Sequence, residues 1–331
     1  MLTHPFFRLF EGNQVTENIK IVIPEFGKPD VLDFVSGEIP EPQKGEVLIK
    51  VYFSGLNPID VKTRAGMGWA AAQNKDNLPW TPGYEISGKI VSMGENTQRF
   101  VEGDTVAGLV GFPLNAGGYS QYLCVAEEHL SLVPSAVTLE AAAALPVAAQ
   151  TAAQALNKAG VKAGDRVLIL AGAGGVGHIA VQIAVAAQAE VYTTCSESNL
   201  DYLANLGAHA VNYQFAPVSE RVSDVDVLID LIGGDVALDA LKCLKDKARV
   251  VTVPTITKDL ICEKAEILGF SADGMLVEPN PEQLNTMLYM VSVGLLKVDV
   301  QPAISYKNVV EAHHRLETGH TRGKLVLDMR C

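Results

Sequence analysis

The sequence predicts a two-domain α/β protein, in which a partly open β-barrel precedes a doubly wound parallel sheet. Short strands punctuated by Gly and Pro fill residues 19–134, and strands alternate with helices from about residue 138 onward. The chain has 331 residues, of which 48% are hydrophobic and 19% charged, which is enough apolar material for two cores. We place the first domain at residues 1–140 and 302–331, and the second at 141–301.

Short strands account for the first domain. Residues 19–35 (IKIVIPEFGKPDVLDFV) are expected to form two strands around a Gly-Lys-Pro turn, and residues 39–58 add turn residues and an alternating strand. Further short strands follow within EISGKIVSMG, DTVAGLV, GGYSQYLCV and HLSLVP. The first eighteen or so residues precede this pattern, and we interpret them as a loose extension.

Regular alternation defines the second domain. Thr138 and Glu140 are expected to open a helix that continues to Lys158. The elements predicted after it are a strand at 166–170, a helix at 174–187, a strand at 190–194, a helix at 198–206, strands at 210–213, 225–232, 249–253 and 266–270, a helix at 282–293 and a strand near 298–301. Strand cores such as VLIL are apolar on both faces, which indicates a parallel sheet covered by helices on both sides. The tail, NVVEAHHRLETG followed by GKLVLD, is predicted to return to the first domain as a helix and a strand.

Charge and cysteine usage exclude several classes of partner. The net charge of −12 argues against nucleic acid, because an acidic protein repels phosphate backbones. The five cysteines are scattered and form no C-x-x-C pair, which fits a reducing compartment and argues against a disulfide framework. The N-terminus has no signal-peptide core, and the apolar run at 141–156 is too short and too polar to span a bilayer. We therefore expect a cytoplasmic protein with no membrane partner.

A glycine cluster in residues 168–184 (LILAGAGGVGHIAVQIA) predicts a Rossmann dinucleotide site, because G-x-G-x-x-G lies between a predicted strand and a predicted helix. Gly172 is expected to permit the tight turn, Gly174 to let the backbone approach a pyrophosphate, and Gly177 to let the helix pack against the strand. The N–H groups of the helix N-terminus can hold phosphates without a lysine. A purely structural turn is the alternative. The predicted binding residues of this turn are Gly172, Gly174, Gly175, Val176 and Gly177.

The end of the following strand, VYTTCSES, favours NADPH over NADH. An NAD site usually has Asp or Glu here to bind the ribose 2′-hydroxyl, whereas this chain has Thr194 and Cys195. The hydroxyl groups of Thr194 and Ser196 leave room for a 2′-phosphate. No Arg or Lys occurs in residues 190–200 and Glu197 is close by, so NADH stays an alternative.

Several motifs together resemble the medium-chain dehydrogenase/reductase superfamily, and most closely its zinc-independent quinone oxidoreductase (zeta-crystallin-like) branch. The motifs, in chain order, are EFGKPDVL, GLNPIDVKTRAG (55–66), PGYEISGKIVSMG (82–94), GGYSQY (117–122), ALPVAAQTAAQAL (144–156), AGAGGVGHIA (171–180) and the terminal GKLVLD. The resemblance implies a GroES-like barrel domain, a Rossmann domain and a cleft between them where nicotinamide meets substrate. It also implies a homodimer formed through the edge strand near Val298.

The resemblance further implies that zinc is absent. Zinc alcohol dehydrogenases of the same superfamily hold their catalytic metal with cysteine and histidine. Where those enzymes have the first cysteine, this chain has Asn57, and where they have the histidine of a Gly-His-Glu motif it has Tyr84 followed by Glu85. Val147 or a neighbour stands at the last cysteine, and the four-cysteine structural lobe is missing.

Two residues are candidates for catalysis, because both lie on the loop that carries a metal ligand in the zinc enzymes. Asn57 is predicted to be an orienting hydrogen-bond donor, with a loop-capping side chain as the alternative. Lys62 is predicted to be an oxyanion partner or a proton source, with a solvated surface lysine as the alternative. Several quinone reductases carry a tyrosine at the position of Lys62.

Further positions are predicted to bind the cofactor. Thr151 resembles a family threonine that packs against the nicotinamide. The alternative is an interior helix residue whose hydroxyl bonds back to a backbone carbonyl. Tyr213 resembles a tyrosine near the adenosine phosphate, and Arg322 could supply the missing cation there; both could equally be surface groups. Ile232 and Phe270 follow predicted strands, where an α/β sheet binds ligands, and Phe270 is expected on the nicotinamide side.

These features predict an enzyme that transfers hydride from NADPH to a quinone or an α,β-unsaturated carbonyl without a metal. The protein would stabilise the negative charge that develops on the substrate oxygen, while the cofactor supplies the difficult chemistry. An enoyl-thioester reductase and an alcohol dehydrogenase of the same superfamily are alternatives. A nicotinamide-binding protein with little turnover is the alternative from another class.

Overall fold

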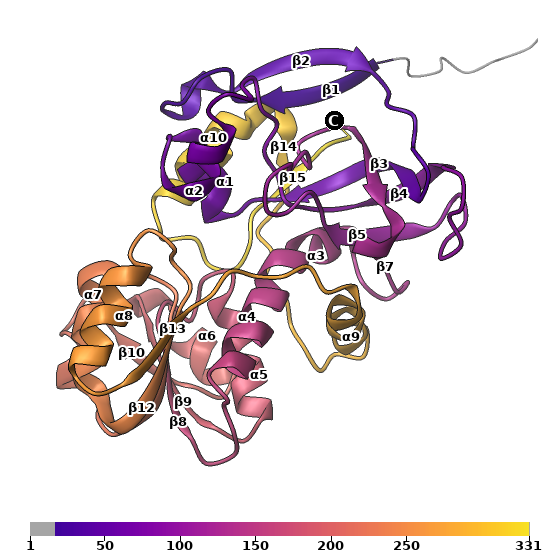
Figure 1. Cartoon of the computed structure of the whole chain (residues 1–331). Coiled ribbons are helices and arrows are strands. Elements are labelled where there is room, and N and C mark those ends of the chain that lie inside the picture. Colours follow the sequence, from indigo (N-terminus) through magenta and orange to yellow (C-terminus); the bar gives the residue numbers. More distant parts are fainter. Residues whose placement is uncertain (1–16, 331) are drawn as a thin grey trace, which may run out of the picture.

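The computed structural model describes residues 17–330, so most of the predicted N-terminal extension, and Cys331, lie outside the described part of the chain. Residues 17–330 form two lobes, each built around its own sheet, which are joined by helices α3 (Leu139–Ala144) and α4 (Pro146–Lys158) (Figure 1). The predicted architecture, a doubly wound parallel sheet with a partly open β-barrel domain, is confirmed.

The upper lobe in Figure 1 is a curled seven-stranded sheet in the order β14-β15-β3-β4-β5-β7, with β6 paired to β3. Its strands are β3 (Glu46–Gly55), β4 (Glu85–Met93), β5 (Thr105–Leu109), β6 (Tyr122–Ala126), β7 (Leu130–Leu132), β14 (Ile304–Ser305) and β15 (Val326–Asp328). The register of β3 against β4 shifts twice, at Leu48/Ile49 and at Val51/Phe53. Such bulges bend a strand, and here they help to curl the sheet around its core. A separate hairpin, β1 (Glu17–Val22) and β2 (Asp33–Glu38), lies at the top of the lobe in Figure 1.

The lower lobe contains a parallel sheet in the order β10-β9-β8-β11-β12-β13. Its strands are β8 (Arg166–Ile169), β9 (Glu190–Cys195), β10 (His209–Asn212), β11 (Val225–Asp230), β12 (Leu244–Thr252) and β13 (Ser271–Gly274). Helices α5 (Gly177–Ala186), α6 (Leu200–Asn205), α7 (Gly234–Ala240) and α8 (Lys258–Ile267) connect them. The strand order runs outward from β8 to β10 on one side and from β11 to β13 on the other, so the switch point lies between β8 and β11. Doubly wound sheets bind ligands at this point.

The remaining α-helices of the described chain are α1 (Pro58–Arg64), α2 (Gly68–Asn74), α9 (Pro281–Ser292) and α10 (Val309–Glu317). Helix α9 connects the lobes, since it packs against both α4 and β7, and Ser131 Oγ donates a 3.0 Å hydrogen bond to Pro281 O. Of the helices in residues 17–330, none has the length and apolarity needed to cross a membrane.

The predicted helix from Thr138 to Lys158 is in fact two helices. Thr138 caps the first, accepting the Ala141 N–H at 3.2 Å, as its sequence position indicated. The helix ends at Ala144 and a second begins at Pro146, because proline has no N–H for the preceding turn but is favourable at the start of a helix. The break places the N-terminus of α4 at the junction of the lobes.

Two predicted strands are wrong. Residues 266–270 complete helix α8 and its turn, where the Phe270 N–H bonds to Ala265 O, and the strand comes afterwards as β13. The short apolar run of Ile267, Leu268 and Phe270 gave a misleading strand pattern. Residues 298–301 contribute a single bridge, between Val300 and Lys324, and are not part of the parallel sheet. The segment near Val298 is therefore not a sheet edge; the edge strands of the parallel sheet are β10 and β13.

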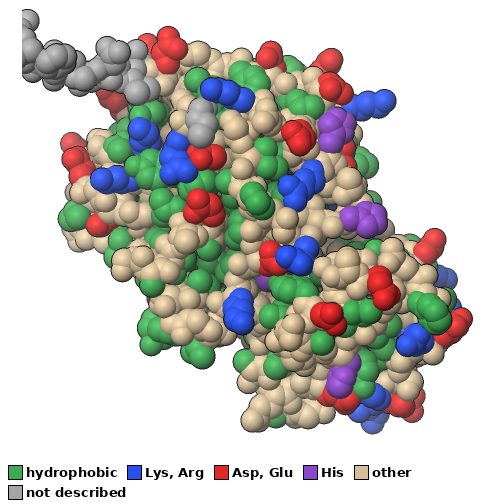
Figure 2. All heavy atoms as spheres, turned by 180° about the vertical axis from the view of Figure 1, so that it is seen from behind, with side chains coloured by type: hydrophobic (Ala, Val, Ile, Leu, Met, Phe, Trp, Pro, Cys, Tyr) green, Lys and Arg blue, Asp and Glu red, His purple; other side chains and the backbone are tan. Residues whose placement is uncertain are grey.

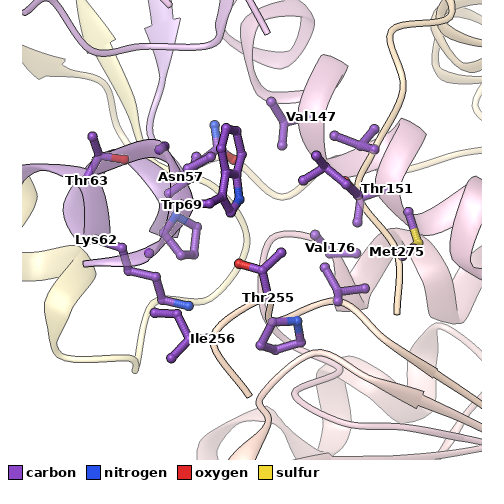
Figure 3. A pocket seen from close by; sticks show the side chains of 18 of the residues that line it. Asn57, Lys62, Thr63, Trp69, Val147, Thr151, Val176, Thr255, Ile256 and Met275 are labelled. Carbon is purple, nitrogen blue, oxygen red and sulfur yellow. The ribbon is translucent and has the colours of Figure 1, made fainter. Parts of the chain in front are cut away.

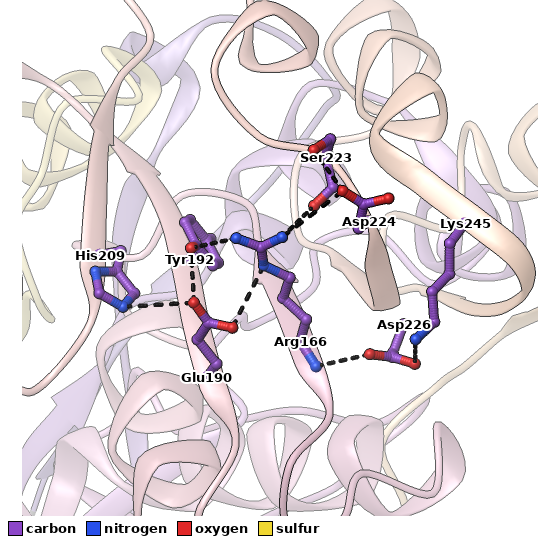
Figure 4. Close-up of polar contacts among 8 residues, drawn as sticks. All are labelled: Arg166, Glu190, Tyr192, His209, Ser223, Asp224, Asp226 and Lys245. Atoms are coloured by element: carbon purple, nitrogen blue, oxygen red, sulfur yellow. Dashed lines mark hydrogen bonds and ion pairs between the residues drawn. The ribbon is translucent and has the colours of Figure 1, made fainter.

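A polar network ties together the amino-terminal ends of the parallel strands (Figure 4). Arg166 donates to the Tyr192 hydroxyl at 2.6 Å, and that hydroxyl donates to Glu190 at 2.7 Å. The Arg166 backbone N–H bonds to Asp226 at 2.9 Å, and Lys245 forms an ion pair with the same carboxylate at 2.5 Å. Strands β8, β9, β11 and β12 are thus linked by side chains at the edge opposite the glycine turn.

His313 makes the stability of the fold pH-dependent. It is fully buried on α10, with Nε2 3.4 Å from the Tyr119 hydroxyl. Burial, followed by the charge of Arg64, lowers its pKa to about 3. Because the unfolded-state pKa is higher, about 6.5, the stabilising contribution is complete above pH 6.5 and is lost as the pH falls toward 3.

Between pH 6.5 and pH 5 we expect the unfolding free energy of the wild-type protein to fall by about 2 kcal/mol more than that of the His313→Phe variant. Urea titrations of both proteins at several pH values measure this difference. The two proteins are compared with each other because Asp60 also makes stability pH-dependent in both. Its pKa is raised to about 7, so its effect on stability as the pH falls is opposite to that of His313. Parallel stability curves for the two proteins would show that His313 does not titrate as described.

Candidate active site

The glycine turn lies between the lobes, at the carboxyl end of β8. It lines a groove together with Asn57 and Lys324. A Cβ on Gly177 would overlap Ala171 O, so this glycine allows the close packing that the sequence predicted. A Cβ on Gly174 would have only Ala171 O within 4 Å, at 3.3 Å, and would otherwise face open space. The turn therefore fits a pyrophosphate approaching the backbone at Gly174.

The reason for Gly172 differs from the prediction. The positive backbone angle of the tight turn belongs to Ala171, with φ of 55°, and Gly172 is not in the left-handed region. A Cβ on Gly172 would instead overlap the Thr193 side chain on β9. Gly172 is thus needed for contact with the neighbouring strand.

The residues after β9 differ in accessibility. Thr194 is buried, and its hydroxyl oxygen accepts the Ala171 N–H at 2.9 Å, so this side chain supports the turn. Ser196 Oγ is partly exposed and accepts from Asn199 Nδ2 at 3.0 Å. The Tyr213 ring is 47% exposed, and its backbone N–H bonds to Cys195 O.

A polar pocket joins this segment to the C-terminal part of the chain. Its lining combines Ser198 and Asn199 with Arg315, His320 and Arg322. Arg322 forms a 2.8 Å ion pair with Asp299, and its guanidinium lies 5.1 Å from the centre of the Tyr202 ring. Two arginines from far along the chain, Arg315 and Arg322, thus line one pocket with Ser198 and Asn199.

Of the two positions predicted after strands, one lies at the groove. Ile232 is 46% exposed there, and Asp230 holds its N–H and that of Gly233 at 2.9 and 2.7 Å. Phe270 is a correction: it precedes β13, at the other end of the sheet, and packs against the core beneath α8. Met275, which follows β13, lines the cleft in its place.

A largely apolar cavity of about 180 Å³ adjoins the groove and has walls from both lobes. In Figure 3, Asn57, Lys62 and Trp69 face Thr151 and Met275 across it. A cavity of about 150 Å³ can hold benzene, so one quinone ring or a short enal fits. The predicted residues Asn57, Lys62, Thr151 and Val176 are thus brought to one cavity.

Lys62 is the basic residue of this cavity. Its side chain extends from α1 toward Thr255 and Ile256 (Figure 3). Burial lowers the pKa of its ammonium. No carboxylate of residues 17–330 lies within ion-pairing distance of it, although the chain is acidic.

A buried polar cluster occupies the positions compared with zinc ligands. Lys324 Nζ lies 2.6 Å from Glu85 Oε1 and donates to Asn57 Oδ1 at 2.6 Å and to Leu56 O at 2.8 Å. Asn57 Nδ2 donates to Glu85 Oε1 at 2.8 Å, and the Val147 N–H bonds to the other carboxylate oxygen at 2.7 Å.

Lys324 was missed by the sequence reasoning. The available signal was a lysine within an otherwise apolar strand motif, GKLVLD, next to Arg322.

Two further side chains hold this region in place. The Tyr84 hydroxyl donates to Pro113 O at 3.2 Å, and burial raises its pKa. The Asp60 carboxylate accepts the N–H groups of Asn57 and Gly83 at 2.9 and 3.0 Å. Burial raises the pKa of Asp60 to about 7 despite these bonds. The loop before α1 is therefore fixed on both sides of Asn57.

Comparison with known proteins identifies the superfamily. Residues 43–135 match the alcohol dehydrogenase GroES-like domain and residues 206–327 the zinc-binding dehydrogenase family. The 2-methylene-furan-3-one reductase of Solanum lycopersicum is 33% identical, over 92% of this chain and 77% of the relative. The chloroplastic NADPH-dependent alkenal/one oxidoreductase of Arabidopsis thaliana is 32% identical, over 92% and 78%. The solved quinone oxidoreductase from Coxiella burnetii is 41% identical, with a TM-score of 0.92 over 95% of this chain and 100% of that one.

This chain belongs to the medium-chain dehydrogenase/reductase superfamily, in its quinone oxidoreductase branch. The resemblance drawn from the motifs is confirmed. As a member of this superfamily the protein is an NAD(P)H-dependent oxidoreductase, with a GroES-like domain and a Rossmann sheet on either side of the cleft.

The geometry of the turn predicts that Gly174→Val abolishes measurable NADPH binding without unfolding the protein. The new side chain would fill the groove, while a Cβ at this position has room. Fluorescence titration measures binding and a thermal melt measures folding. The matched control is Gly37→Val, at an exposed strand position where a Cβ has no neighbour within 4 Å. Unchanged NADPH affinity in Gly174→Val would mean that the pyrophosphate binds elsewhere.

Proposed function

We propose that this oxidoreductase reduces quinones or α,β-unsaturated carbonyls with NADPH and without a metal ion. The observation that carries the proposal is the meeting of the glycine groove and the apolar cavity at Asn57, with the ammonium of Lys62 facing the same cavity. The relatives support the proposal by their names, which describe reductases of quinones, of alkenals and enones, and of a methylene-furanone.

In the proposed reaction the bound nicotinamide supplies a hydride. Negative charge then develops on the oxygen of the acceptor, and preorganised donors in a dry site stabilise it. One amide N–H of Asn57 bonds to Glu85, which leaves the second as a donor. Lys62 provides a positive charge, and the lowering of its pKa by burial makes it a better proton donor than an exposed lysine. Trp69 and Thr151 line the cavity and orient the two reactants.

The preference for NADPH rests on the polar pocket beyond the turn. Arg315 and Arg322 lie there with Ser198 and Asn199, and arginines with hydroxyl or amide groups suit a 2′-phosphate. No acidic side chain of residues 17–330 takes the place of the ribose-binding Asp or Glu at the end of β9. NADH stays the alternative, because the charge of Arg322 is already paired with the carboxylate of Asp299.

The chemistry of the side chains supports a reaction without zinc. Asn57, Tyr84 and Val147 stand at the three compared ligand positions and offer an amide, a phenol and an aliphatic group. The one carboxylate of the buried cluster, Glu85, is already neutralised by Lys324, whose charge would repel a cation. We found no group of three potential metal ligands among residues 17–330.

The domain division, oligomeric state and location belong to the same proposal. We propose the division into a barrel domain of residues 1–140 and 302–331 and a Rossmann domain of residues 141–301, and the sheet membership of the described residues supports it. A homodimer is proposed, with β10 and β13 as the available sheet edges. A small-molecule acceptor is proposed rather than nucleic acid, since basic and acidic side chains are interspersed on the face shown in Figure 2. A cytoplasmic location is also proposed.

The test is to follow NADPH oxidation with a panel of quinones, enals, enones, enoyl thioesters and simple aldehydes. We expect turnover with quinones or enones, and the same rate after metal chelation and dialysis. Turnover of enoyl thioesters alone would favour that alternative. Tight NADPH binding with no acceptor reduced would contradict the proposed enzyme, and zinc retained in stoichiometric amount would contradict the metal-free mechanism.

We expect Asn57→Ala to lower kcat about 100-fold, as loss of one preorganised donor typically does. The affinity for NADPH, measured by titration without acceptor, should change less than about threefold because the glycine groove is intact. An equal loss in kcat and in NADPH affinity would show that Asn57 is structural.

We expect Arg322→Gln to raise the KM for NADPH by about tenfold and to leave the KM for NADH unchanged, because a charge-assisted contact to the 2′-phosphate is lost. Arg99→Gln, at an exposed arginine that donates to Glu127 O in the barrel lobe, is the control. If both cofactors lose affinity equally, Arg322 does not read the 2′-phosphate.

A further inference from the structure

Lys324 connects segments that are distant in the sequence. Its backbone N–H bonds to Asp299 O at 2.8 Å, and the preceding residue, Gly323, donates to Ala173 O in the glycine turn at 2.8 Å. Its side chain passes beside Gly175, where a Cβ would lie 2.8 Å from Lys324 Cδ, and ends against Leu56 and Glu85 in the barrel lobe. One residue therefore touches the cofactor groove and the loop before α1.

Both charges of this cluster are removed from water. Lys324 is 3% exposed and Glu85 is fully buried. Desolvating two ions is unfavourable, and apolar side chains of the same size often serve stability equally well. Stability alone therefore does not explain an ion pair at this position. A need to hold the neighbouring polar groups in one orientation does explain it.

The ion pair determines which way the Asn57 amide faces. An ammonium only donates hydrogen bonds and a carboxylate only accepts them. Asn57 Oδ1 must therefore face Lys324, at 2.6 Å, and Nδ2 must face Glu85, at 2.8 Å. Rotating the amide by 180° would place N–H against the ammonium and the carbonyl oxygen against the carboxylate, so both contacts would become repulsive.

The fixed orientation matters for the second amide N–H. Glu85 accepts one hydrogen of Nδ2, and among residues 17–330 no acceptor is present for the other. Asn57 lines both the groove and the cavity, so this N–H is available to a ligand only in the orientation that the ion pair imposes.

We propose that Lys324 and Glu85 are positioning residues that lock the Asn57 amide with its free N–H available to the cofactor or acceptor. This inference rests on the proposed reductase function for its effect on rate. The amide orientation itself is a property of the protein without cofactor and can be measured separately.

The central variant is the double substitution Lys324→Met with Glu85→Gln, which removes both charges together. Lys324→Met alone would leave a buried, unpaired carboxylate and could unfold the protein. In the double variant the amide can adopt either orientation, because glutamine both donates and accepts and methionine does neither strongly. We expect kcat to fall about 10- to 100-fold, as for other side chains that orient a reacting group through a second one.

The cofactor-free measurement is the side-chain amide spectrum of the full chain labelled with ¹⁵N-asparagine, in which Asn57→Ala identifies the signal. The wild-type protein should show one set of Asn57 resonances, with one proton strongly hydrogen-bonded. The double variant should show two sets or an averaged one. NADPH affinity should change less than about threefold. That result would show that the groove is intact and that the lower kcat comes from the orientation of Asn57.

A matched control removes another ion pair by Lys245→Met with Asp226→Asn, at the opposite edge of the sheet, and should leave kcat and the Asn57 signals unchanged. A folded Lys324/Glu85 double variant with wild-type kcat, or with a single unchanged set of Asn57 resonances, would overturn the proposal. If the wild-type protein reduces no acceptor, the proposed function fails, and the amide spectra still decide whether Lys324 and Glu85 orient Asn57.

Discussion

The ammonium of Lys324 and the carboxylate of Glu85 meet at 2.6 Å where the barrel, helix α4 and the C-terminal segment converge. Neither charge has access to water, so each depends on the remaining hydrogen bonds that surround it. Leu56 O accepts from the lysine and the Val147 N–H donates to the carboxylate. Val147 belongs to α4, so these directional polar contacts tie the barrel to the helix that leads into the Rossmann lobe, and the apolar cavity lies beside them.

Much of the fold follows from local pattern. The glycine turn, the capping of α3 by Thr138 and the alternation of strands and helices depend on residues close in sequence. The predictions failed where a short apolar pattern suits either structure. Residues 266–270 end a helix instead of forming a strand, and for that reason Phe270 lies away from the cleft. Gly172 shows the same limit, since its requirement comes from Thr193 on the next strand.

The residues of the candidate site likewise fall into those that the sequence predicted and those that it could not. Asn57, Lys62 and Thr151 come from motifs with a characteristic spacing, and the structure brings them to one cavity. The contact of Lys324 with Asn57 and the shared pocket of Ser198 and Arg322 could not be predicted from spacing, because each brings together residues separated by more than a hundred positions. Such contacts depend on how the chain returns to the barrel after the parallel sheet is complete.

The network around Arg166 has a consequence for how this protein can change over evolutionary time. It fastens the amino-terminal ends of the parallel strands, whereas the groove and the cavity lie at their carboxyl ends. Trp69, on α2, and Ile256, in the loop between β12 and α8, line the cavity, and neither belongs to that network. Substitutions among the residues that line the cavity can therefore change which acceptors fit, while the side-chain links between the parallel strands stay intact.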